Sequence, residues 1–194
     1  MPSMSTRHEN TKEHLLETGR QILSCQGFGS VGLSTLLKEA GVPKGSFYHY
    51  FQSKEQFGEA LLASYFSQYL AEMDAIFGVR GASGRELLLE YFTRWQERYG
   101  DCLVIKLGAE VADLSDAMRM TLEAGTDRVV KRLARAIDAA IADGSLPAKD
   151  SQALAVNLYQ LWLGAGLLRK LNRDQAGMET TMQLTRHLLD SPAS

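Results

Sequence analysis

Helical spacing of apolar residues runs through almost the whole chain, and no other periodicity competes with it. The clearest run comprises Val129, Val130, Leu133, Ala136, Ile137, Ala140 and Ile141. Alternation with period two, which is typical of a half-buried strand, is not sustained anywhere. Only four prolines occur, and each lies near a terminus or at a predicted break between helices. The pattern predicts an all-α fold.

Caps and breakers divide the chain into nine predicted helices. We expect Asn10 or Thr11 to cap the first helix and Ser53 to cap the fourth, because short polar side chains accept hydrogen bonds from the free amides of a first turn. Glycine-containing breaks end several of the others. The expected helices cover about 11–26, 33–40, 44–50, 54–77, 85–98, 103–113, 116–143, 150–172 and 176–190.

Composition narrows the possible classes of protein. A net charge of -2 argues against a protein that coats nucleic acid through excess positive charge. Two cysteines, Cys25 and Cys102, are too few for a disulfide scaffold or a cysteine-rich zinc site, and they suggest a reducing compartment. The sequence has no apolar run of about 18 residues and no apolar leader. We therefore expect a cytoplasmic protein with no membrane span, no metal site and no cofactor.

The segment LSTLLKEAGVPKGSFYHYFQSK, residues 33–54, has the pattern of a helix-turn-helix. Two short helices are joined by a glycine-containing turn, and the second helix of such a motif enters the major groove of DNA. Gly45 permits close approach of the backbone to DNA, and Phe47 and Phe51 are expected to anchor the helix in the core. The polar candidates for contact with phosphates or base edges are Lys44, Ser46, Tyr48, His49 and Lys54.

Residues 11–58 resemble the DNA-binding domain of TetR-family transcriptional regulators, most clearly in AGVPKGSFYHYFQSKEQF. The resemblance implies an all-helical homodimer that binds a palindromic double-stranded operator, with three N-terminal helices on DNA. It implies a helix-turn-helix domain at 1–54 and a ligand-sensing and dimerisation domain at 55–194, with the last two helices at the dimer interface. Carried over residue by residue, DNA contacts fall on Ser34, Lys44, Gly45, Ser46, Tyr48, His49 and Lys54. Val31-Gly32 departs from the Thr-Thr with which many relatives begin the second helix.

Two further segments, DCLVIKLGAEVADLSDAMR at 101–119 and LWLGAGLLRKL at 161–171, resemble a TetR subfamily that responds to electrophiles and oxidants. The resemblance implies that Cys102 is the sensor and that Lys170 reacts with its oxidised form. Thiolate is the reactive form of cysteine, and a helix start favours thiolate, whereas Asp101 opposes it. Direct adduct formation, a Cys102–Lys170 link and a Cys102–Cys102 bridge across the dimer all remain open. We expect a repressor that leaves its operator when Cys102 is modified.

Two alternatives stand beside covalent sensing. The same elements also resemble regulators that bind small unsaturated acids, so a reversible small-molecule inducer is the second interpretation. Its candidate pocket residues are Tyr91, Trp95, Met118 and Trp162. A cysteine-dependent enzyme is remote, because the few histidines offer no evident base for Cys102, and we expect no enzyme. Cys25, near the end of the first helix, is expected to be buried and inert.

Overall fold

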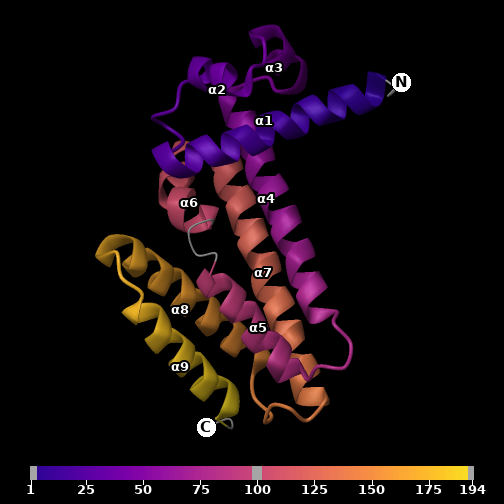
Figure 1. Cartoon of the computed structure of the whole chain (residues 1–194), viewed down its shortest axis with the longest axis vertical. Coiled ribbons are helices and arrows are strands. Elements are labelled where there is room, and N and C mark those ends of the chain that lie inside the picture. The colour runs from indigo at the N-terminus through magenta and orange to yellow at the C-terminus, as the bar shows by residue number, and fades with distance from the viewer. Residues whose placement is uncertain (1–3, 98–101, 192–194) are drawn as a thin grey trace. The chain divides into compact units, whose positions relative to one another are not determined.

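Helices account for most of the residues that the computed structural model describes, 4–97 and 102–191 (Figure 1). Nine are found in this part of the chain: α1 (Met4–Gln26), α2 (Leu33–Ala40), α3 (Lys44–Tyr50), α4 (Lys54–Phe77), α5 (Gly84–Glu97), α6 (Leu103–Leu114), α7 (Asp116–Ala142), α8 (Ser151–Asn172) and α9 (Ala176–Asp190). None of the described residues forms a β-strand, which confirms the all-α prediction. No described helix is both long enough and apolar enough to span a membrane.

The start of α1 differs from the prediction. The helix begins at Met4, so Asn10 and Thr11 lie inside it and the prediction that either caps it was wrong. No proline or glycine stands between Met4 and Gly19, so nothing interrupts the helix on that side.

Cys25 is exposed, and the prediction that it is buried was also wrong. Leu15 and Leu23 form the inward face of α1, with at most 1% of either residue exposed. Cys25 follows Leu23 by two positions, which places it about 200° around the helix from that leucine. The helical register therefore turns the thiol outward.

The described chain divides into two compact units, and each is built from two separate stretches of sequence. Unit 1 combines the chain up to residue 67 with residues 106–125, and unit 2 combines 68–105 with 126–194. The expected division at 54/55 remains a prediction.

In unit 1, α1 packs against α2 and α2 packs against α3. An aromatic group ties α3 to α4, because the Phe47 ring lies 5.2 Å from that of Phe51 and 5.7 Å from that of Phe57. The second stretch adds buried side chains from α6 and α7: Leu107, Val111, Met118 and Leu122. Gly58 permits a close approach here, since a Cβ atom at this position would lie 2.5 Å from the Met118 sulfur. Unit 1 therefore depends on both of its stretches.

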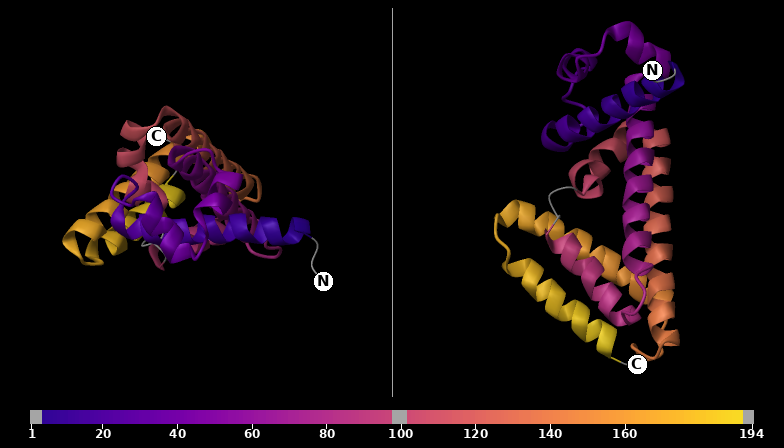
Figure 2. Two further views of the ribbon diagram at one scale, coloured as in Figure 1. Left: turned by 90° about the horizontal axis from the view of Figure 1, so that it is seen from above. Right: turned by 45° about the vertical axis from the view of Figure 1, so that its right-hand side comes forward.

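In unit 2, α8 lies alongside α9, and α5 also packs against α9 (Figures 1 and 2). Trp162 of α8 is fully buried, stacks on Phe92 of α5 at 5.1 Å and donates its indole N–H to the Thr185 hydroxyl of α9 at 2.9 Å. An ion pair between Arg85 and Asp190 joins α5 to the end of α9. These contacts fix the three helices that surround the aromatic cluster.

Candidate DNA-binding and sensing sites

The turn between α2 and α3 has the geometry of a helix-turn-helix. Gly41 ends α2 in the left-handed conformation, with φ of 62°, and such a conformation favours glycine. The Gly41 amide donates to the carbonyl of Lys38, and the Val42 amide donates to that of Leu37. Pro43 then directly precedes α3 in an extended conformation. The tight turn expected at 41–43 is confirmed.

The two faces of α3 differ in their exposure. Phe47 is fully buried and Phe51, which follows the helix, is 2% exposed, as predicted for the anchors. Lys44, Gly45, Tyr48 and His49 are exposed and Ser46 is half-buried, so the candidate contact residues of this helix are accessible to a ligand. The Lys44 ammonium lies 5.9 Å from the centre of the Tyr48 ring.

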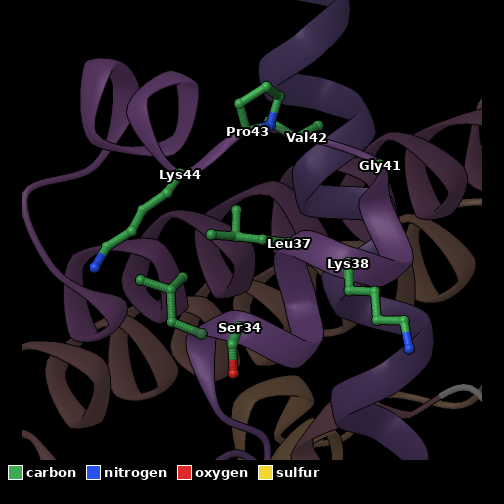
Figure 3. Close-up of a pocket in the computed structure, with 8 residues that line it drawn as sticks. Ser34, Leu37, Lys38, Gly41, Val42, Pro43 and Lys44 are labelled. Carbon is green, nitrogen blue, oxygen red and sulfur yellow. The ribbon is translucent and has the colours of Figure 1, made fainter.

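A groove of about 530 Å³ runs between α2 and α3 (Figure 3). Its walls include Ser34, one of the predicted contacts, and two lysines, Lys38 and Lys44. In Figure 3 these lysines lie on either side of Leu37, with their ammonium groups apart. Lys38 was not among the predicted contacts, although its place as an exposed basic residue in the last turn of α2 could have suggested it.

Lys54 points into unit 1. Its ammonium donates a hydrogen bond to the Phe28 carbonyl and lies 4.5 Å from the centre of the Phe28 ring. Partial burial lowers the pKa of Lys54, and the carboxylates of Glu55 and Glu110 act in the opposite direction. The helix that Lys54 begins is capped as predicted, since the Ser53 hydroxyl accepts from the Gln56 amide at 3.1 Å. A phosphate contact by Lys54 remains a prediction.

Sequence reasoning missed Glu110 of α6. Its carboxylate accepts from the backbone amide of Phe28 at 3.0 Å and from that of Gly29 at 2.7 Å. We call this the Glu110 clamp. It holds the turn between α1 and α2, where Gly27 has a φ of 86°. Because the partners are 81 and 82 residues apart in sequence, no local pattern could have indicated the clamp.

The candidate sensor Cys102 is 6% exposed and directly precedes α6. Lys170 is exposed in the last turn of α8, and Asp101 lies outside the described residues. Burial raises the pKa of Tyr159 and, to a lesser extent, the negative charge of a Cys102 thiolate does so too. Burial likewise raises the pKa of Tyr91, a hydrogen bond with Tyr69 lowers it, and Cys102 again raises it. A Cys102 thiolate would therefore make both buried phenols harder to ionise.

Three of the four candidate pocket residues come together in unit 2. The rings of Trp95 and Trp162 lie 5.2 Å apart, and Tyr91 belongs to the same aromatic cluster through Phe92 at 4.9 Å. Met118 belongs to unit 1, where it packs beside Gly58. Within the described residues, no group of histidine, cysteine, aspartate and glutamate side chains could hold a metal ion.

Comparison with known proteins identifies the family. Residues 15–61 match the family model "Bacterial regulatory proteins, tetR family", and residues 85–185 match "Tetracyclin repressor-like, C-terminal domain". The chain is 36% identical to the HTH-type transcriptional repressor NemR of Escherichia coli, over 97% of this chain and 98% of that protein. It is 37% identical to the transcriptional regulator AcuR of Cereibacter sphaeroides, over 88% of this chain and 79% of that protein. The crystal structure of reduced E. coli NemR superposes with a TM-score of 0.90 and covers 95% of this chain and 100% of that one. The chain is therefore a member of the TetR family of transcriptional regulators.

Proposed function

We propose that this protein is a dimeric repressor that binds a palindromic operator and leaves it when Cys102 reacts with an electrophile or an oxidant. The observation that carries the proposal is the position of Cys102 directly before α6, the helix that bears the Glu110 clamp. The likeness to NemR, which is named a repressor, supports the repressor assignment. Action on operator DNA makes the cytoplasm its site of action.

The dimer is proposed to form through α8 and α9. Leucines on these helices are exposed: Leu167, Leu168, Leu171 and Leu184. Gly164 of α8 has open space where a side chain would stand, so another helix can approach closely. Two such pairs would form a four-helix bundle. The two copies of α3 would then need to lie about 34–36 Å apart to occupy successive turns of the major groove.

The response is proposed to travel along α6. Glu110 lies about two helical turns beyond Cys102. A group bonded to the buried sulfur needs space, and a shift of the helix start moves Glu110 with it, because a helix transmits displacement along its axis. The clamp then pulls on the amides of Phe28 and Gly29. Since the Phe28 carbonyl also accepts from Lys54, the movement reaches the start of α4 as well.

The reactions open to Cys102 depend on the exposure of its sulfur and of the Lys170 ammonium. Cys102 is buried and Lys170 is exposed, so a link between them requires one side chain to change its surroundings. A Cys102–Cys102 bridge across the dimer requires the same of both sulfurs. A direct adduct requires only that a small reagent reach the sulfur, and it is the first step that we favour.

Reversible inducer binding is the second candidate function. The aromatic cluster around Trp162 favours it, because ligand pockets are lined mainly by apolar and aromatic side chains. The name of the relative AcuR, a transcriptional regulator, does not identify a ligand.

The test is a footprint on the DNA upstream of the protein's own gene, with and without a quinone. The Cys25→Ser protein should protect a palindromic DNA site in the footprint, and this protection should disappear when the quinone is added. The Cys102→Ser protein should protect the same site with and without the quinone. Release of Cys102→Ser at the parental dose would contradict covalent sensing and favour the reversible inducer. Absence of protection at any palindrome would contradict operator binding. Lys170→Met in the same assay tests the condensation step.

A further inference from the structure

A cavity of about 370 Å³ lies within unit 2, and neither of the chain's two tryptophans lines it. It is found where the end of α4, the start of α5 and the second half of α7 come together (Figure 1). Half-buried apolar side chains form part of its wall, Phe77 of α4 and Leu87 of α5. Ala136 and Ala139 of α7 add two small ones. This size and this lining are typical of a site for a small molecule.

The charged residues of the cavity leave one positive charge in excess. Arg132 and Arg135 of α7 line it together with Asp74 of α4, so two guanidinium groups accompany a single carboxylate. The two arginines are three positions apart, which places them on one side of the helix. Arg135 is exposed, and 31% of the Arg132 side chain is exposed, so both are accessible from solvent. The cavity therefore favours a singly charged anion.

Arg132 uses only part of its capacity for hydrogen bonds. One Nη atom donates to the Asp74 carboxylate at 2.6 Å, whereas the Nε atom is enclosed and has no hydrogen-bond partner. Since buried polar groups are nearly always hydrogen-bonded, the missing partner of this N–H requires an explanation. The Nε–H and Nη–H groups of arginine form a fork that matches the two oxygens of a carboxylate. A carboxylate in the cavity would supply the missing acceptor once the Arg132 side chain turns toward it.

The wall formed by the start of α5 is held in place without a ligand. A Cβ atom at Gly84, which also lines the cavity, would lie 2.5 Å from the Cα of Ala140, so α5 packs directly on the α7 backbone. The Gly84 amide donates to the Asp143 carboxylate at 2.7 Å. The next amide, that of Arg85, donates to the Ser145 hydroxyl at 3.0 Å. Because this wall needs no ordering when a ligand enters, the cost of binding is reduced.

We propose that this cavity is a binding site for a small organic carboxylate. Arg132 and Arg135 bind the charged group, and Asp74 competes with it for Arg132. Phe77 and Leu87 contact the apolar part of the molecule. Inorganic phosphate is a poor ligand for the same site, because it has no apolar part to place against these side chains. The inference goes beyond the proposed function, because it involves neither the sensing cysteine nor the DNA-binding residues.

The experiment measures the binding of phenylacetate to the full-length protein by isothermal titration calorimetry. Phenylacetate is a monoanion with one apolar ring, and phenylacetamide has nearly the same shape without the charge. We expect one phenylacetate per chain, and phenylacetamide should bind at least about tenfold more weakly because it lacks the charge-assisted hydrogen bonds. No binding of phenylacetate at millimolar concentration, equal binding of the amide, or preferred binding of inorganic phosphate would each overturn the proposal.

Two substitutions test where the carboxylate binds. Arg135→Gln removes an exposed guanidinium and should weaken phenylacetate binding about tenfold or more. Asp74→Asn removes the competing negative charge and should strengthen binding about threefold or more. A gain of affinity distinguishes a direct effect on the site from damage to the fold. If either substitution leaves the affinity unchanged, the ligand lies elsewhere and the proposal fails.

Arg128→Gln is the matched control, because Arg128 is an exposed arginine of the same helix, about 10 Å along its axis from Arg135. Salt screens a charge at that distance, so the phenylacetate Kd should stay within about twofold. An equal loss in Arg128→Gln and Arg135→Gln would show a general effect of charge and contradict the site. Cys102→Ser should bind phenylacetate as the parent does, whatever its response on the operator. Loss of binding in that variant would place the ligand at the cysteine instead of in this cavity.

Discussion

Gly45→Ala should raise the stability of the protein and lower its affinity for DNA. Gly45 is the second residue of α3, is exposed, and has no atom within 4 Å of the place where a Cβ would stand. Its φ is not positive, so alanine fits the backbone. Replacing a helical glycine by alanine stabilises by about 0.5–1 kcal/mol. For a chain of this length, that gain raises Tm by about 1–4 °C.

The same methyl group lies on the face that we assign to DNA. If the α3 backbone contacts the operator at Gly45, the added methyl group must push the DNA away from the backbone. Losing even one good contact costs about 1–3 kcal/mol of binding free energy per half-site. The dimer carries two such sites, so we expect the operator Kd to rise at least 30-fold in fluorescence anisotropy at fixed salt.

Gly177→Ala is the matched control, because Gly177 is the second residue of α9 and also has open space at its Cβ position. It should raise Tm similarly. Because α9 is proposed for the dimer interface, Gly177→Ala serves as the control for Tm alone. Unchanged operator affinity in Gly45→Ala would refute the placement of Gly45 against DNA. A fall in Tm would refute the packing argument.

Three further substitutions test other contacts. Glu110→Gln loses the charge that holds two amides, so urea denaturation should show a loss of about 1–2 kcal/mol, and an unchanged midpoint would argue against the clamp. Trp162→Phe leaves the buried Thr185 hydroxyl without its indole donor and should cost about 1–3 kcal/mol in the same assay; a smaller loss than in an exposed Met120→Ala control would contradict this. Leu171→Glu places a charge in the proposed interface, so sedimentation should show a monomer and operator binding should weaken; a stable dimer would place the interface elsewhere.

Local chemistry explains why most of the fold could be predicted. Ser53 and Gly41 set the ends of helices through hydrogen bonds with residues a few positions away, so both effects are visible in a short stretch of sequence. The buried places of Phe47 and Phe51 follow from apolar spacing in the same way. The prediction was wrong at α1, where a helix without a breaker continued past two residues that resemble caps.

The candidate sites were less predictable, because their contacts cross long stretches of chain. In the sequence, Lys54 looks like an unpaired lysine at the start of a helix. In the structure, its ammonium donates a hydrogen bond to a carbonyl 26 residues away. The Glu110 clamp spans a still longer separation. Cys25 could have been placed correctly, since its angle from Leu23 on the helix already turns it outward.

The discontinuity of unit 1 limits how regulators of this kind can exchange parts. A gene fragment that ends at residue 67 would leave behind Leu107, Val111 and Met118, each at most 2% exposed, together with Glu110. Recombination at one crossover would therefore combine the N-terminal stretch of one regulator with residues 106–125 of another. The buried contacts and the residue equivalent to Glu110 would then come from a protein with a different turn between α1 and α2. New operator specificity is reached more readily by substitutions on the exposed face of α3, because these leave the buried contacts of residues 106–125 unchanged. A chimera made in the laboratory should accordingly transfer residues 106–125 together with the stretch that ends at residue 67.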